Sequence, residues 1–375
     1  MDIVYNNIDD CYSKIRRERR GEVQPKYWFC NNFDGRRVLV KRQHRERVNG
    51  QKAKSRTYNH FGELFAYILA DKVGMKACPV QLVSLHDFRN DYGKNKYFFT
   101  ACMSECMRQP DESITPGESV INNYRYHNSK NFDEIVRERN YSYKPEDVNM
   151  VLSPDDNVDV AIEAIKYETR RYEEKMGVFS DEDIEMHVDN NVQDMIDMIV
   201  FDNIFGNSDR HNENWSVIYS NIGTMYVYPM YDNEAILGFR RPEAMIKALA
   251  NRGLSHDLNA RVNFSRMGFS PIHSGVTYKS MLEHLMLMYP EQTVNSMNKI
   301  INNVSISDLE QLYDSAKGIT YRSQDHNELT ENDELPNEYK TYGLTLYKDR
   351  YKYAKHLIKQ HELKLAHEDN IHDIS

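Results

Sequence analysis

A polar segment in the middle of the chain carries side chains suited to binding a metal ion and moving a proton. Asp209 and Asn214 lie five residues apart, and Asp232 follows after a stretch predicted to form a β-hairpin. Mg²⁺ is bound by hard oxygen ligands, and a carboxylate can orient or deprotonate an attacking hydroxyl. The order Asp, Asn, Asp is that in which kinase active sites place a base and two magnesium ligands. The alternative is a loop whose Asp and Asn side chains only cap helices and turns.

The composition restricts the possible functions. The 375 residues are enough for one large core or for two lobes with a cleft between them. The net charge of −9 argues against a dedicated nucleic-acid binder, because phosphate contacts need a basic surface. No apolar run is long enough for a membrane span, and no secretion signal is visible. The five cysteines form no CxxC pair, so reduced thiols in a cytoplasmic protein are expected, with non-classical secretion as an effector left open.

The elements that must position the polar segment are predicted from the period of the apolar side chains. Residues 9–20 are predicted to form a short helix. Strands are then expected at 26–30, 36–41, 79–85 and 96–103, with one helix at 58–73. Farther along, a strongly periodic helix at 188–205 leads directly into the Asp209 loop, so this loop begins on a packed element that can hold its geometry.

The order of these elements predicts an α+β fold with two lobes, like that of protein kinases. Residues 1–106 are expected to form a small, strand-rich N-lobe with one helix. Residues 107–375 are expected to form a larger, mainly helical C-lobe that carries the site.

Two charged residues of the expected N-lobe are candidates for the same site. Lys41 ends an apolar strand, where a lysine either reaches towards water or is held for a ligand. Glu63 lies on the helix face opposite the apolar stripe, beside Ala66 and Ala70. A glutamate there would normally face solvent. The small neighbours would let a strand approach, however, so the Glu63 carboxylate could meet a lysine.

Taken together, these residues resemble the HipA-like kinase family, whose members include the HipA toxin kinase and shorter CtkA-type Ser/Thr kinases. The resemblance rests on Lys41, Glu63, the string Gly206-Asn-Ser-Asp-Arg-His-Asn-Glu-Asn-Trp215 and the string Tyr228-Pro-Met-Tyr-Asp-Asn233. The Asp-Arg-His-x-x-Asn string also occurs in phosphatidylinositol 3/4-kinases, but the flanking Gly206-Asn207 and Trp215 favour the HipA-like group.

The resemblance implies a role for each matching residue. Asp209 would be the base or orienting carboxylate, and His211 would steady it or the phosphoryl oxygens, although a packing role for His211 stays open. Asn214 and Asp232 would hold Mg²⁺. Lys41 would contact the ATP phosphates with Glu63 as its partner, and Asp202 and Asn207 would support the catalytic loop from behind. The backbone of residues 101–107, which include Met103 and Glu105, would form a hinge against adenine.

Four features depart from the family pattern or add to it. The turn Asn31–Gly35 is not a glycine-rich phosphate loop, and Glu234 stands where conventional protein kinases have the glycine of Asp-Phe-Gly. Residues 1–25 leave no room for a further N-terminal domain, so a stand-alone kinase domain is expected. The basic segment 42–57 carries Ser55 and Thr57, which the resemblance makes candidates for autophosphorylation.

The resulting prediction is an ATP- and Mg²⁺-dependent protein serine/threonine kinase that transfers the γ-phosphoryl group to a protein hydroxyl. One alternative is a lipid or small-molecule kinase, which the acidic net charge disfavours. Another is a nucleotide-binding pseudokinase or scaffold, which the complete set of base, metal ligands and lysine disfavours. The sequence names neither the protein substrate nor any antitoxin or regulatory partner.

Overall fold

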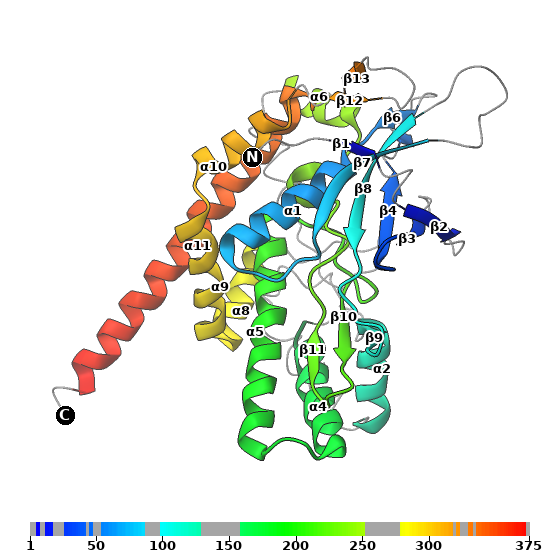
Figure 1. The fold of residues 1–375 in the computed structure, drawn as a ribbon. Helices are drawn as coiled ribbons and strands as arrows, with labels where there is room; N and C mark the ends of the chain where they lie inside the picture. Colours follow the sequence, from blue (N-terminus) through cyan, green and yellow to red (C-terminus); the bar gives the residue numbers. More distant parts are fainter. Residues whose placement is uncertain are drawn as a thin grey trace.

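The structure is a mixed arrangement of α-helices and small β-sheets (Figure 1). It is a computed structural model, and it describes residues 5–7, 12–17, 26–42, 45–47, 54–86, 98–128, 158–251, 278–317, 320–322, 329–332 and 335–372. Among these residues, none of the helices has both the length and the apolar character needed to cross a lipid bilayer.

The first part of the chain forms a six-stranded sheet with the strand order β1-β7-β8-β4-β3-β2. Its strands are β1 (Tyr5–Asn7), β2 (Tyr12–Arg17), β3 (Lys26–Asn31), β4 (Arg37–Arg42), β7 (Val80–His86) and β8 (Phe98–Glu105). β1 pairs with β7 in parallel, and the other neighbours are antiparallel. Between β4 and the first helix, β5 (Arg45–Arg47) and β6 (Lys54–Arg56) form a separate two-stranded sheet.

The helix α1 (Asn59–Val73) packs on one face of this sheet (Figure 1). It ends at Gly74, which adopts the left-handed conformation that glycine accepts without a steric cost. Successive residues of a strand face opposite sides of its sheet. Because Lys41 on β4 pairs with Cys102 on β8, and Cys102 belongs to the core under α1, Lys41 points towards α1.

The remainder of the described chain is mainly helical. Its helices are α2 (Gly117–His127), α4 (Val158–Met176), α5 (Asp181–Phe205), η4 (Ile236–Gly238), α6 (Glu243–Asn251), α8 (Tyr278–Met288), α9 (Pro290–Asn303), α10 (Ile306–Ser315) and α11 (Asn337–His372). Two small antiparallel sheets accompany them: β9 (Ser113–Pro116) with β10 (Ser216–Tyr219) and β11 (Met225–Val227), and β12 (Thr320–Arg322) with β13 (Leu329–Asn332).

The helix α5 stands at the centre of this region and leads into the Asp209 loop (Figure 1). Ser180 and Asp183 form a capping box at its start, which satisfies backbone N–H groups that the helix itself cannot pair. Its final eleven residues, from Met195 to Phe205, are all buried. The side chains of α1, α5 and α11 belong to one continuous hydrophobic core, so the loop after α5 starts from a buried part of that core.

The prediction of a helix at residues 9–20 is wrong, because Tyr12–Arg17 form the edge strand β2. Pairing with β3 outweighs the local helix preference of a short charged segment, since strand formation depends on the neighbouring strand more than on propensity. The helices α2 and α10 and the strand β9 were not expected from the sequence pattern. β9 was hidden by the two prolines nearby, of which Pro116 is its last residue.

Candidate active site

Lys41 is held between two carboxylates from distant parts of the chain. Its Nζ donates hydrogen bonds to Glu63 Oε1 on α1 and to Asp232 Oδ1 at 2.8 Å, and all three side chains are almost completely buried. Burial by itself would lower the pKa of Lys41, but the charges of Asp232, Glu63 and Glu234 outweigh it and raise the pKa well above its usual range. Lys41 is therefore a fixed cation in this site.

The backbone after β11 brings three carboxylates together. Asp232 has a φ of 57°, a left-handed conformation that a non-glycine residue adopts at a cost. The next N–H, from Asn233, donates to Glu63 Oε2 at 3.0 Å, so the turn is tied to α1. As a result, carboxylate oxygens of Glu63, Asp232 and Glu234 lie within 4.8 Å of one another. Such a group of hard oxygen donors suits a divalent cation such as Mg²⁺.

Glu234 is the most unusual carboxylate of this group. Burial, followed by the negative charge of Asp232, raises the pKa of Glu234 to about 7. Its Oε2 accepts a hydrogen bond from Asn59 Nδ2 at 3.2 Å, and its Oε1 lies 3.5 Å from Arg240 Nε. Glu234 thus connects the start of α1 to the carboxylate group.

Arg210 holds the Asp209 loop in place from its buried side. Its Nε and Nη2 donate to the two carboxylate oxygens of Asp202 at 2.8 and 3.1 Å, and both side chains are fully buried. Nη1 donates to the carbonyl groups of Asn214 and Tyr231, and Nη2 also donates to Asn233 Oδ1. All five N–H groups of the guanidinium are used. One side chain therefore ties the end of α5, the Asp209 loop and the Asp232 turn to one another.

Internal hydrogen bonds give the Asp209 loop its shape. Asn207 is buried, donates from Nδ2 to Asp202 Oδ1 at 3.0 Å and accepts the Asp209 N–H at 3.2 Å. Asn214 Nδ2 donates to the Asp209 carbonyl at 2.7 Å. His211 is half-buried, and its Nδ1 accepts the Glu213 N–H at 3.3 Å. In this structure His211 thus caps its own loop.

The carboxylate of Asp209 contacts Arg240, a residue that was not among the predicted site residues. Asp209 Oδ2 accepts a hydrogen bond from Arg240 Nη1. Arg240 follows η4 and is the residue that also approaches Glu234. The predicted base and the carboxylate group are therefore connected through one guanidinium.

The expected hinge involves the backbone of this segment, and the strand register shows where the side chains of Met103 and Glu105 lie. In β8, Val40 is opposite Met103 and Val38 is opposite Glu105, so both side chains lie on the face of the sheet away from Lys41. Met103 packs with Val38 and Val40 in a second small cluster on that face. Any contact of Met103 or Glu105 with a nucleotide beside Lys41 must therefore come from the backbone.

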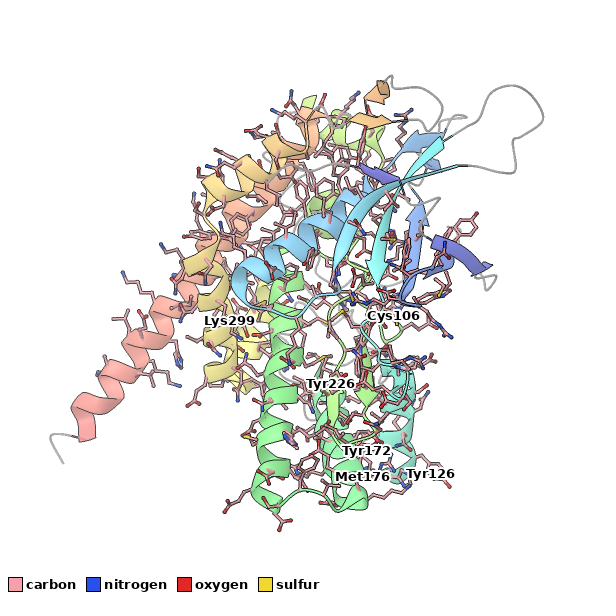
Figure 2. The ribbon with its side chains drawn as sticks, in the orientation of Figure 1. Cys106, Tyr126, Tyr172, Met176, Tyr226 and Lys299 are labelled. Carbon is pink, nitrogen blue, oxygen red and sulfur yellow. The ribbon has the colours of Figure 1, made fainter. Side chains whose placement is uncertain are left out.

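Cys102 and Ser104 are among the side chains that β8 presents on the Lys41 face. After β8, Cys106 lies between the six-stranded sheet and the β10–β11 hairpin (Figure 2). The following N–H, from Met107, donates to the Tyr228 hydroxyl at 2.8 Å. This contact ties the end of β8 to the segment that leads into Asp232.

The two expected phosphorylation sites, Ser55 and Thr57, lie in different surroundings. Ser55 lies in β6, and half of the surrounding segment 42–57 lies outside the described residues. Thr57 is fully buried, and its hydroxyl is 3.1 Å from Asn59 Oδ1. Thr57 would have to leave this position before a phosphate could be added.

Three residues of the site were missed by sequence reasoning. Arg210 lies inside the quoted motif, but its burial becomes evident only when Asp202 and Tyr231 are seen around it. Asn59 is the first residue of α1 and contacts Glu234. Arg240 is the first of a pair of arginines that begins eight residues beyond Asp232, and an arginine soon after the expected metal ligand is a signal that could have been followed.

Comparison with known proteins identifies the family. The model of the HipA-like C-terminal domain family matches residues 21–286, and the chain belongs to this family. No curated protein sequence matches it.

Two solved structures are similar to this one. The first is CtkA, a proinflammatory kinase of Helicobacter pylori, with a TM-score of 0.60 and 15% sequence identity, covering 96% of this chain and 98% of that one. At this identity the likeness shows a shared fold. The second is the HipA, HipB and operator DNA complex of the Shewanella oneidensis MR-1 toxin–antitoxin system, with a TM-score of 0.45 and 14% identity, covering 94% of this chain and 69% of that one.

Proposed function

We propose that this chain is an ATP- and Mg²⁺-dependent kinase that phosphorylates serine or threonine hydroxyls of a protein. The observation that carries the proposal is the burial of Lys41 between Glu63 and Asp232, beside a loop that presents Asp209. A lysine paired with a helix glutamate, close to a metal-binding aspartate, is an arrangement that phosphoryl transfer in protein kinases requires. Membership of the HipA-like family and the fold shared with CtkA agree with it.

On this proposal, each part of the fold has a place in a two-lobe kinase. Residues 1–106, with the six-stranded sheet and α1, would form the smaller lobe that covers ATP. Residues 107–375, with α5 and the Asp209 loop, would form the larger lobe that receives the protein substrate. Lys41 and Glu63 come from the first part, and Asp209, Asn214 and Asp232 come from the second.

The residues present fit a magnesium ion and a triphosphate. Asp232 and Asn214 would hold Mg²⁺ through hard oxygen atoms, and the Asp232 turn and the Asn214 loop are already joined through Arg210. Bound Mg²⁺ would neutralise negative charge on the β- and γ-phosphates. Lys41 would contact the phosphates, and Glu63 would keep its ammonium group in place. Glu234 adds a carboxylate to the same group.

Asp209 would orient the attacking hydroxyl and accept its proton. The hydroxyl oxygen forms a bond to the γ-phosphorus, and the bond from that phosphorus to the β,γ-bridging oxygen breaks. The electron pair of the broken bond stays on ADP. The hydrogen bonds of Asn207 and Asn214 to the Asp209 backbone hold the carboxylate at one place for this step.

The experiment that tests the function is transfer of radiolabelled phosphate. Purified protein is incubated with γ-labelled ATP, Mg²⁺ and a cell lysate, and the labelled species are identified. A residue that orients or deprotonates the nucleophile typically contributes about 10²–10⁴-fold in rate. We expect Asp209→Asn to lose phosphate transfer in that range while its affinity for Mg·ATP is retained. Label on lipid alone, or equal transfer by wild type and Asp209→Asn, would contradict the proposal.

A further inference from the structure

Arg210 and Arg240 both lie in this site, but they differ in burial and in how many of their N–H groups are hydrogen-bonded. Arg210 is fully buried and donates all five of its guanidinium N–H groups to neighbouring residues. Arg240 keeps 37% of its side-chain surface exposed, and Asp209 is its one hydrogen-bond acceptor within the part of the chain that the structure describes. Arg240 therefore has N–H groups left for a molecule that enters the site.

The backbone on both sides of Arg240 is fixed. Phe239 is fully buried, and its carbonyl accepts the Tyr58 N–H at 2.9 Å. The carbonyl of Arg241 accepts a hydrogen bond from the Tyr339 hydroxyl. A cation carried on a fixed backbone needs little reorganisation when charge develops next to it, which is the condition for strong electrostatic catalysis.

The Arg240 guanidinium also lies between two acidic groups of the site. It hydrogen-bonds to Asp209 on one side and lies 3.5 Å from Glu234 Oε1 on the other. Glu234 in turn belongs to the carboxylate group of Glu63 and Asp232. The guanidinium thus lies between Asp209, the proposed base, and the carboxylate group that contains Asp232, a proposed metal ligand. In phosphoryl transfer, the group that is transferred passes between the oriented nucleophile and the metal-bound phosphates.

We propose that Arg240 is a catalytic residue whose guanidinium contacts the transferred phosphoryl group. This inference rests on the proposed kinase function and adds a residue to it. As the hydroxyl oxygen bonds to the γ-phosphorus and the bond to the bridging oxygen breaks, negative charge is spread over three equatorial oxygens. Arg240 keeps its proton and neutralises that charge, while the hydroxyl proton goes to Asp209. The contact uses N–H groups that Arg240 does not donate to Asp209.

The test measures binding as well as turnover. The probes are Mg·ADP alone and Mg·ADP with aluminium fluoride, which imitates the planar phosphoryl group, and both are titrated by calorimetry. Release of phosphate from ATP gives the turnover. The variants are Arg240→Ala, Arg240→Lys and, as a neighbouring control, Arg241→Gln, because the Arg241 guanidinium lies over the Tyr342 ring at 5.7 Å and not in the site.

We expect Arg240→Ala to bind Mg·ADP like wild type. It should lose about 10²–10³-fold of the affinity that aluminium fluoride adds, with a comparable fall in turnover. Arg240→Lys should keep part of the effect, because a lysine is a point charge without the planar fork of arginine. Arg241→Gln should match wild type. A purely structural role of Arg240 would instead weaken Mg·ADP binding and the aluminium fluoride complex equally.

The outcomes separate this inference from the proposed function. If wild type gains affinity from aluminium fluoride and Arg240→Ala gains as much, the assignment of Arg240 is wrong and the kinase proposal stands. If wild type neither binds Mg·ADP nor releases phosphate from ATP, both are wrong. Thermal unfolding of each variant checks that it is folded. If Arg240→Ala does not fold, the gain in affinity from aluminium fluoride is compared between wild type and Arg240→Lys instead.

Discussion

Gly62 of α1 lies directly against the backbone of Glu234. A Cβ atom placed on Gly62 would be 2.5 Å from the Glu234 carbonyl oxygen and 2.9 Å from its carbonyl carbon, distances at which the backbone must move. Because Glu63 is the next residue, the contact sets how closely the helix glutamate approaches the turn that carries Asp232. The absence of a side chain at residue 62 is therefore part of the site.

Gly62→Ala should push α1 away from the Glu234 backbone. We expect a loss of stability of about 1–3 kcal/mol, the usual cost of overpacking a tight contact, together with weaker Mg·ATP binding. Chemical denaturation and calorimetry measure the two effects. Gly74→Ala is the matched control, because Gly74 has a φ of 70° but a Cβ atom added to it would meet no atom beyond the adjoining backbone within 4 Å. It should lose stability without losing nucleotide affinity, and equal nucleotide binding by both variants would contradict the prediction.

Lys41 and Glu63 should behave as one unit. Glu63→Gln leaves Lys41 with Asp232, whereas Lys41→Met leaves two buried carboxylates without their cation. We expect each single change to reduce ATP turnover and the double change to cost less than the sum, because contacting residues are not additive. A double-mutant cycle on turnover of ATP measures this coupling. Strictly additive losses would show that the buried contact has no part in nucleotide use.

The Asp202–Arg210 pair should be costly to break. Asp202→Ala leaves the fully buried Arg210 without its carboxylate, and removal of one partner of a buried ion pair typically costs about 3–5 kcal/mol. The exposed bidentate pair of Arg170 and Glu185 is the comparison, with Glu185→Ala expected to cost less than about 1 kcal/mol. Urea denaturation of both variants gives the two free energies of unfolding. Similar costs would mean that Arg210 finds other partners.

Glu234 should make stability depend on pH near neutrality. Its pKa in the folded protein is about 7, above the ordinary 4.5, so between these values the folded state keeps a proton that the unfolded state has lost. The contribution of Glu234 to stability is therefore fully present at the acidic end of this window and is lost as pH rises through 7.

Comparison of wild type with Glu234→Gln isolates this contribution from other titrating groups. The difference in unfolding free energy between the two proteins should change by on the order of 2–3 kcal/mol from pH 5 to pH 8, with wild type losing more stability as pH rises. Denaturation in Mg²⁺-free buffer at several pH values measures it. A constant difference would show that Glu234 is already ionised throughout.

The sequence was sufficient for the order of the site residues but not for the side chains around them. Lys41, Glu63 and Asp232 could be named because their types and order suit one chemistry. The face of α1 that carries Glu63 followed from helix periodicity, but whether that face meets solvent or a strand depends on contacts far apart in the chain. Whether Cys102 or Met103 lies on the same face of the sheet as Lys41 depends on the register of the strands. A shift of one residue would exchange the two, and no local sequence pattern specifies that register.

The buried arginine illustrates the same limit. Arg210 lies between Asp209 and His211 in a polar loop, where a charge is normally solvated. Its burial is stabilised by Asp202, which is eight residues away, and by carbonyl groups of Asn214 and Tyr231, which only the folded chain brings together. Arg240 was missed for a similar reason, since its contact with Asp209 spans a hairpin, the Asp232 turn and η4.

The continuity of α1 with the main core determines which part of the site can move. Phe65 on α1 meets Phe239 and Tyr313 at ring-centre distances of 4.9 and 5.2 Å, and Lys72 near its end pairs with Asp308 of α10 at 2.5 Å. A swing of the helix that carries Glu63 would break these contacts together. On the proposed function, we therefore expect α1 and its Glu63 to keep their place against the main core when a nucleotide enters or leaves the site.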